Sequence, residues 1–181
     1  MIAWETARHQ VAIAGRATND LTGAGLAGAL VTVQGTGISL EVRTGADGHF
    51  HFLDLPNGTY TLQATMPGAG SRYGTVQAQA IVSSAAGGRI LLAAADLALP
   101  PTALRGEITK QGGGTVLLAE VRLAGSGERA LSDGDGLYLL AGVETGSRTV
   151  RVMAQGFLPQ ERPVLLTTGI AAVLNVTLVP A

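Results

Sequence analysis

Apolar side chains recur at every second position along much of the chain, which is the period of a half-buried β-strand. Alternating segments of this kind occur in both halves of the sequence, at residues 31–33, 40–42, 50–52, 60–64, 121–123, 138–140, 150–152 and 176–178. The alanines of Ile81–Leu99 would suit a helix, but Gly87 and Gly88 interrupt that segment. We therefore predict an all-β chain and assign Ile81–Leu99 to two strands.

Turn-forming pairs separate the alternating segments. Asp-Gly at residues 47–48 and 135–136, and Asn-Gly at residues 57–58, accept the positive φ of tight turns between antiparallel strands. Residues 44–68 and residues 132–156 carry nearly the same order of turns and alternating runs. About seven short strands in each copy predict two tandem seven-stranded Greek-key antiparallel β-sandwiches.

The boundaries follow from the repeat and from two prolines. Pro100 and Pro101 end the first copy, because proline cannot donate to a β-ladder, and they form a short, stiff linker. We predict an N-terminal arm at residues 1–9, a first sandwich at residues 10–100 and a second sandwich at residues 101–181.

The repeated motif resembles the carboxypeptidase regulatory-like family, in two copies that cover residues 10–181. The first copy carries it at Gly15, Ala29, Asp47, Gly48, Phe50, Phe52, Gly58, Tyr60 and Gly68, and the second at Gly106, Ala119, Asp135, Gly136, Tyr138, Gly146, Gly156 and Phe157. The second copy departs by placing Arg148 where the first has Tyr60. The resemblance implies a transthyretin-like, Ig-like sandwich without catalytic activity, acting as a spacer, adhesive module or assembly part. Related sandwiches bind starch, so the resemblance also leaves carbohydrate binding open.

Composition and charge narrow the classes of partner. The 181 residues include no cysteine and carry a net charge of −1, with 12 basic and 13 acidic side chains spread along the chain. We therefore expect neither disulfides nor thiolate chemistry, and no nucleic-acid partner. The start MIAWETARHQ lacks the pattern of a signal peptide, and Arg89–Leu99 is too short to span a bilayer. We expect no membrane insertion and a protein that is cytoplasmic as synthesised, as part of a particle released later.

Two motifs suggest metal binding, but the pattern favours structural roles. The alternation that buries Phe50 and Phe52 places His49 and His51 on the solvent side, and the second copy has leucines there. Residues 132–136, SDGDG, resemble the start of a calcium loop but lack the later oxygen ligands, which favours a tight turn. Weak calcium binding by Asp133 and Asp135 stays open as the alternative. We predict no metal site and no cofactor.

Catalytic residues are not evident. Ser132 and Ser147 have no histidine in their copy of the repeat, and the sequence has no Gly-x-Ser-x-Gly motif. We predict that the chain is not an enzyme. A hydrolase hidden in the loops is the weakest alternative.

The candidate contact residues are Trp4, Arg72 and Tyr73. Trp4 is the only tryptophan and precedes the first predicted strand, and Arg72 and Tyr73 share a glycine-rich loop. We predict a structural or binding protein with a protein partner or a second copy, within a phage tail or contractile injection particle. The alternative is a carbohydrate-binding module that uses Tyr73.

Overall fold

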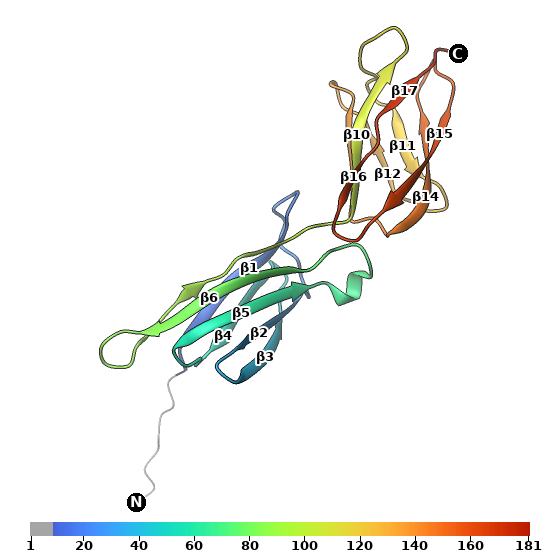
Figure 1. The fold of residues 1–181 in the computed structure, drawn as a ribbon. Helices are drawn as coiled ribbons and strands as arrows, with labels where there is room; N and C mark the ends of the chain where they lie inside the picture. Colours follow the sequence, from blue (N-terminus) through green and yellow to red (C-terminus); the bar gives the residue numbers. More distant parts are fainter. Residues whose placement is uncertain (1–8) are drawn as a thin grey trace, which may run out of the picture. The chain divides into compact units, whose positions relative to one another are not determined.

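The structure, a computed structural model, describes residues 9–181 and divides into two compact units built of β-strands (Figure 1). The first unit contains the chain up to Gly68 together with Thr75–Leu99, and the second contains Ala69–Gly74 together with Pro100–Ala181. In each unit two sheets bury apolar side chains between them. The prediction of two all-β sandwiches is confirmed.

The first unit holds nine strand segments. They are β1 (Val11–Asn19), β2 (Leu30–Gly35), β3 (Ile38–Arg43), β4 (His49–Leu53), β5 (Gly58–Thr65), β6 (Val76–Ser84), β7 (Ile90–Leu91), β8 (Ala93–Ala94) and β9 (Leu97–Leu99). One sheet has the order β4-β1-β8, with β9 also paired to β1, and the other has the order β3-β2-β5-β6-β7. The chain therefore crosses between the sheets after β1, β3 and β4, as in a sandwich with Greek-key connections.

The second unit repeats this arrangement without a counterpart of β7. Its strands are β10 (Ala103–Lys110), β11 (Glu120–Leu123), β12 (Arg129–Leu131), β13 (Leu137–Ala141), β14 (Gly146–Met153), β15 (Gln160–Leu166), β16 (Ala171–Val173) and β17 (Val176–Leu178). One sheet has the order β13-β10-β16, with β17 also paired to β10, and the other has the order β12-β11-β14-β15. A single short 3₁₀ helix, η1 (Pro67–Ala69), follows β5.

The last strand of each unit is interrupted where it passes a glycine of the first strand. A Cβ on Gly106 would lie 2.0 Å from the carbonyl oxygen of Leu174, and one on Gly15 would lie 2.0 Å from that of Ala95. At the same point a side-chain oxygen replaces the ladder, because Asn175 Oδ1 accepts the backbone N–H of Glu107 at 2.9 Å. Only glycine permits this approach, which explains why both copies of the motif have it at this position.

Alternation along the strands builds the two cores. In the first unit Phe50 and Phe52 pack edge to face with ring centroids 6.1 Å apart, and Tyr60 is fully buried beside them. The second core is mainly aliphatic, and Tyr138 is its buried aromatic ring. The Tyr138 hydroxyl donates to the carbonyl oxygen of Leu174 at 2.6 Å, and burial raises the pKa of this phenol.

One turn prediction is wrong. Gly48 and Gly136 adopt positive φ angles of 87° and 74°, as the Asp-Gly pairs predict. Gly58 does not have a positive φ and instead begins β5, where a Cβ would lie 2.4 Å from Cγ2 of Thr36. Glycine is needed there for close packing and not for the turn.

Replacing Gly106 with alanine tests the close approach. We expect Gly106→Ala to lower the free energy of unfolding of the second unit by about 2–3 kcal/mol, because the β16–β17 connection must move away from β10. Gly127→Ala is the matched control, since a Cβ there has open space. Urea unfolding followed by hydrogen exchange in peptides of the second unit measures both. Equal stability of the two variants would contradict the packing argument.

Candidate functional site

The loop at residues 69–74 is part of the second unit, although it connects β5 and β6 of the first. Its backbone runs antiparallel to the segment that leads into β10. The N–H of Gly74 donates to the carbonyl of Pro100 at 2.8 Å, and the N–H of Thr102 donates to the carbonyl of Arg72 at 2.9 Å. Tyr73 forms the β-bridge with Pro101 between these two bonds, and its side chain is half-buried.

Arg72 lies at the centre of a group that we call the acid–arginine cluster, formed by Arg72, Glu128, Glu144 and Arg148. Arg72 Nη1 donates to Glu128 Oε1 at 2.7 Å and also to the carbonyl of Gly142. Its Nη2 lies 3.6 Å from Glu144, whose other carboxylate oxygen lies 3.7 Å from Arg148. The Ser126 hydroxyl and then the Arg72 guanidinium hold the pKa of Glu128 below its usual value against the opposing effect of burial.

Hydroxyl groups complete the attachment of the loop. Thr102 is fully buried, and its Oγ1 donates to the carbonyl of Ser71 at 2.7 Å and accepts the N–H of Gly169 at 2.9 Å. Ser71 Oγ accepts the N–H of Thr145 at 3.0 Å. The sequence alone does not single out Thr102 or Ser71, because their partners lie up to 74 residues away.

The acid–arginine cluster explains the departure of the second copy from the motif. In the first unit the Tyr60 hydroxyl donates to the carbonyl of Pro56 at 2.9 Å and accepts from Thr36 at 2.7 Å. Arg148 and Glu144 occupy the positions equivalent to Tyr60 and Pro56, and they form an ion pair across the same four-residue spacing. The second copy thus replaces a tyrosine-to-backbone hydrogen bond with charged groups, to which Arg72 adds a further pair.

A second device is common to both units and was also missed from the sequence. Thr44 Oγ1 donates to the carbonyl of Leu26 and accepts the N–H of Ala29 at 2.9 Å. Ser132 makes the equivalent two bonds in the second unit, at 2.6 and 2.9 Å. Both hydroxyls are buried and fasten the segment before β2 or β11. Their matching place in the two copies is the only sequence signal that could have indicated them.

The residues considered for metal binding have local partners. His49 and His51 both lie on the exposed face of β4, and the His49 ring is 2.8 Å from Asp47. The His49 backbone N–H, followed by its ring, lowers the pKa of Asp47. Asp133 Oδ1 accepts the N–H groups of Asp135 and Leu137, at 3.0 and 2.9 Å, which confirms the predicted tight turn. Within residues 9–181 no group of three His, Cys, Asp or Glu side chains is placed to hold a metal ion.

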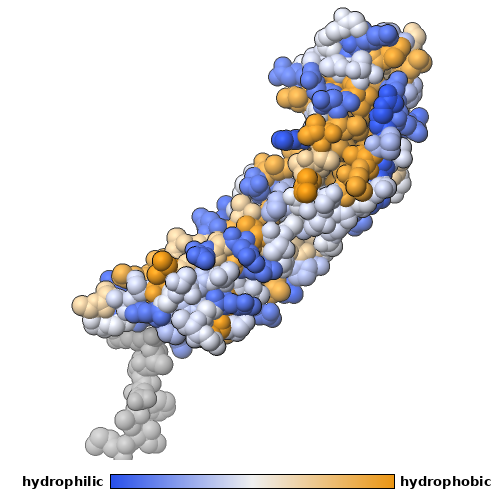
Figure 2. All heavy atoms as spheres, viewed as in Figure 1, coloured by the Kyte–Doolittle hydropathy of each residue, from blue (hydrophilic) through white to orange (hydrophobic). Residues whose placement is uncertain are grey.

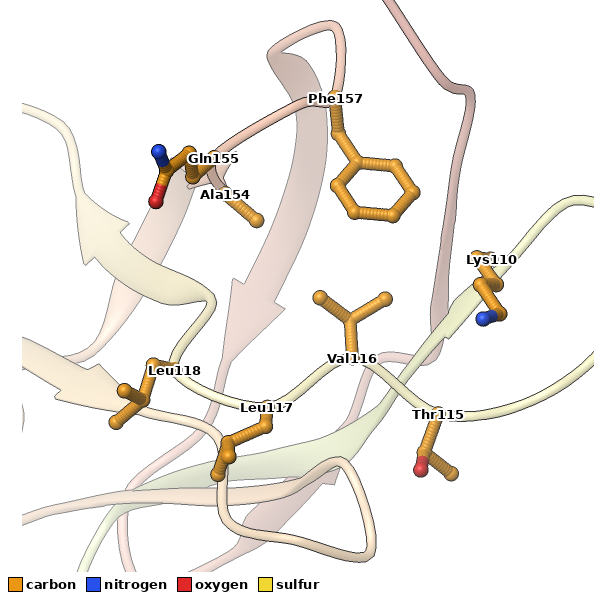
Figure 3. Close-up of a pocket in the computed structure, with 8 residues that line it drawn as sticks. All are labelled: Lys110, Thr115, Val116, Leu117, Leu118, Ala154, Gln155 and Phe157. Carbon is orange, nitrogen blue, oxygen red and sulfur yellow. The ribbon is translucent and has the colours of Figure 1, made fainter.

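The end of β10 farthest from the linker carries an apolar pocket of about 450 Å³, which we call the end pocket (Figure 3). Its lining residues are Lys110, Thr115, Val116, Leu117, Leu118, Ala154, Gln155 and Phe157. Val116 and the Phe157 ring point toward each other in Figure 3, and Leu117 and Leu118 are 59% and 62% exposed. The described residues include no helix with the length and apolar character needed to cross a bilayer.

The structure thus places two of the three predicted contact residues. Arg72 and Tyr73 lie together in the second unit, where both contribute to its internal packing. Trp4 lies outside the described residues. That any of the three binds a ligand stays a prediction.

Removing Arg72 tests the acid–arginine cluster. We expect Arg72→Ala to lower the free energy of unfolding of the second unit by about 1–2 kcal/mol, because Glu128 loses its closest cation. A double-mutant cycle with Glu128→Gln should give a coupling of about 1 kcal/mol. Arg129→Ala is the control, since Arg129 is 68% exposed and 3.8 Å from Glu120, and should change stability by less than about 0.5 kcal/mol. Additive effects of the Arg72 and Glu128 variants would contradict the pairing.

Comparisons with solved structures find distant β-sandwich proteins. The shaft pilin SpaA from Lactobacillus rhamnosus GG is 10% identical with a TM-score of 0.46, over 97% of this chain and 98% of that one. The Bacillus anthracis TIE protein is 15% identical with a TM-score of 0.43, over 94% of this chain but only 34% of that one. A cohesin-X-dockerin complex from Acetivibrio cellulolyticus gives 19% identity and a TM-score of 0.34, over 42% of this chain and 51% of that one. These likenesses transfer no property beyond the fold.

The family comparison is decisive in a way that the solved structures are not. A comparison with curated protein sequences gives no match. The model of the carboxypeptidase regulatory-like domain matches residues 12–86 and, a second time, residues 103–179. The two matches coincide with the two repeats and together cover most of the sequence. The chain belongs to the carboxypeptidase regulatory-like domain family and carries two copies of the domain in tandem.

Proposed function

We propose that the protein is a non-catalytic structural module that docks on protein partners within a larger assembly. The observation that carries this proposal is an apolar patch on the outer surface of the sheet β13-β10-β16. Leu137, Leu139 and Val173, which we call the apolar face, are 51%, 44% and 62% exposed. Exposed apolar groups that gather on one sheet face are typical of protein interaction sites.

Strand register places the three side chains of the apolar face together. Arg105 of β10 is paired with Leu139 on one side and with Val173 on the other, so these residues form a row across three strands. Glu107, next on the same face of β10, is paired with Leu137. Arg105 and Glu107 thus lie among the apolar side chains, and a polar rim of this kind favours a specific partner over unspecific aggregation. Apolar residues are also concentrated on the side of the second unit that Figure 2 shows.

The first unit does not share the apolar face. At the positions equivalent to Leu137 and Leu139 it has His49 and His51, and Ala94 occupies the position of Val173. Both sandwiches are closed with these different residues, so the fold does not require the leucines. A surface requirement of the second unit accounts for them better than a packing requirement.

The assembly that we propose is a phage tail or a contractile injection particle. Both kinds of particle are built in the cytoplasm, where disulfides are rarely stable. The absence of cysteine from the sequence and the closure of both cores by Val, Leu, Ile and Ala suit such a compartment.

Sedimentation of the tagged chain from its native host tests the proposal. We expect the chain to sediment with a large particle after lysis, and the variant Leu137→His/Leu139→His to do so about fivefold less, because apolar contacts at the centre of an interface dominate its affinity. The variant introduces the residues of the first copy and should fold. Ile81→Thr, which changes an exposed side chain of β6, is the control and should sediment as the wild type does. Sedimentation of the wild type as free protein in every fraction would contradict the proposal.

A glycan array distinguishes the alternative of a carbohydrate-binding module. We expect no binding that depends on Tyr73, because its half-buried side chain and its bridge to Pro101 leave less of the ring open for a sugar to stack on. Binding by the wild type that Tyr73→Ala abolishes and Arg129→Ala leaves intact would favour the carbohydrate-binding module.

A further inference from the structure

We propose that the end pocket of the second unit binds residues 1–8 of a second copy of the chain. This inference deepens the proposed assembly role, on which it rests, by naming one contact and both of its sides. It joins an exposed apolar site in the second unit with the arm that precedes β1 and contains the only tryptophan of the sequence.

The end pocket differs from the equivalent end of the first unit in one direction. Leu117 and Leu118 occupy the positions of Ala27 and Gly28, as the equivalent backbone hydrogen bonds of Leu118 to Ser132 and of Gly28 to Thr44 show. Both replacements add large apolar side chains, and both of those side chains are mostly exposed. The second unit therefore presents apolar surface where the first does not.

Leu118 gives independent support, because it adopts a conformation that disfavours its side chain. Its φ is +58°, close to the +74° of Gly28, and a leucine in this left-handed region costs about 1 kcal/mol relative to glycine. The side chain does not regain this cost by burial within its own unit, since it is 62% exposed. A contact outside the unit would compensate for the strain.

The arm has the chemistry that the end pocket would accept. Residues 1–8 read MIAWETAR and place Ile2 and Trp4 within a short apolar stretch, followed by Glu5. A volume of about 450 Å³ is large enough for an indole ring and a neighbouring aliphatic side chain. Lys110, the only lysine of the sequence, lines the pocket and has the charge opposite to that of Glu5.

The point where the arm begins favours a second copy over the same chain. Gln10 and Asp54 exchange backbone hydrogen bonds, the Gln10 N–H also donates to the Asp54 carboxylate at 2.8 Å, and His9 pairs with that carboxylate. The arm is thereby fixed at the start of β1, whereas the linker leaves beside the end of β1, where Asn19 is paired with Leu99. Eight residues span at most about 28 Å, roughly the length of β1 itself. The arm of the same chain would be used up before it reached the linker.

Tryptophan fluorescence of the full chain tests this contact directly, because Trp4 is the only tryptophan. We expect the emission to shift to shorter wavelength as the protein concentration rises, in parallel with self-association measured by analytical ultracentrifugation. An emission maximum typical of exposed tryptophan at all concentrations would overturn the proposal. A shift that is independent of concentration would assign the end pocket to the arm of the same chain and would overturn the second copy as its occupant.

Two variants locate the contact. Leu117→Ala/Leu118→Gly introduces the residues of the first copy and relieves the positive φ of Leu118, so it should fold, and we expect it to weaken self-association at least about tenfold. Trp4→Ala should have the same effect. Leu137→His/Leu139→His removes the apolar face and should leave the fluorescence shift unchanged. If that variant alone abolishes the shift, the arm does not bind the end pocket. If self-association fails while particle sedimentation persists, the proposed function stands without this contact.

Discussion

The passage of the last strand over a glycine of the first strand is the constraint on which each sandwich depends. At Gly15 and at Gly106 a backbone carbonyl oxygen lies where a Cβ would be, 2.0 Å from its ideal position. The first strand can therefore pair on both of its edges and form the centre of its sheet. The last strand is divided into two short pieces at this point, and the side chains of Asp96 and Asn175 satisfy the backbone N–H groups that the interruption would leave without a partner.

Because the two copies share this frame, the positions at which they differ show what the frame does not require. The shared features are the glycine approach, the buried hydroxyls of Thr44 and Ser132, and the alternating core. The differences lie at three places of the second unit: the acid–arginine cluster, the apolar face and the end pocket. The first of these places is occupied by the loop that carries Arg72. The other two are exposed, and a partner is the physical reason that we offer for them.

The sequence predicts the fold well because burial has a short period. Alternation alone places Phe50 and Phe52 inside and the neighbouring histidines outside, and the structure agrees. The loop contacts are different, since Arg72 meets Glu128 across 56 residues and no local pattern links them. Gly58 shows a further limit: its glycine serves a close contact with the side chain of Thr36, which depends on strand pairing and is invisible in an Asn-Gly dipeptide. Burial depends on local order along the chain, whereas sites depend on tertiary proximity.

The central claim is that the second domain of this carboxypeptidase regulatory-like pair carries the docking surfaces. Hydrogen–deuterium exchange of the chain in its native assembly, compared with the isolated chain, measures this most directly. The account predicts added protection at residues 115–118, 137–139 and 154–158, without added protection at the equivalent residues 25–28 and 49–51 of the first domain. Protection confined to the first domain, or equal in both, would contradict it.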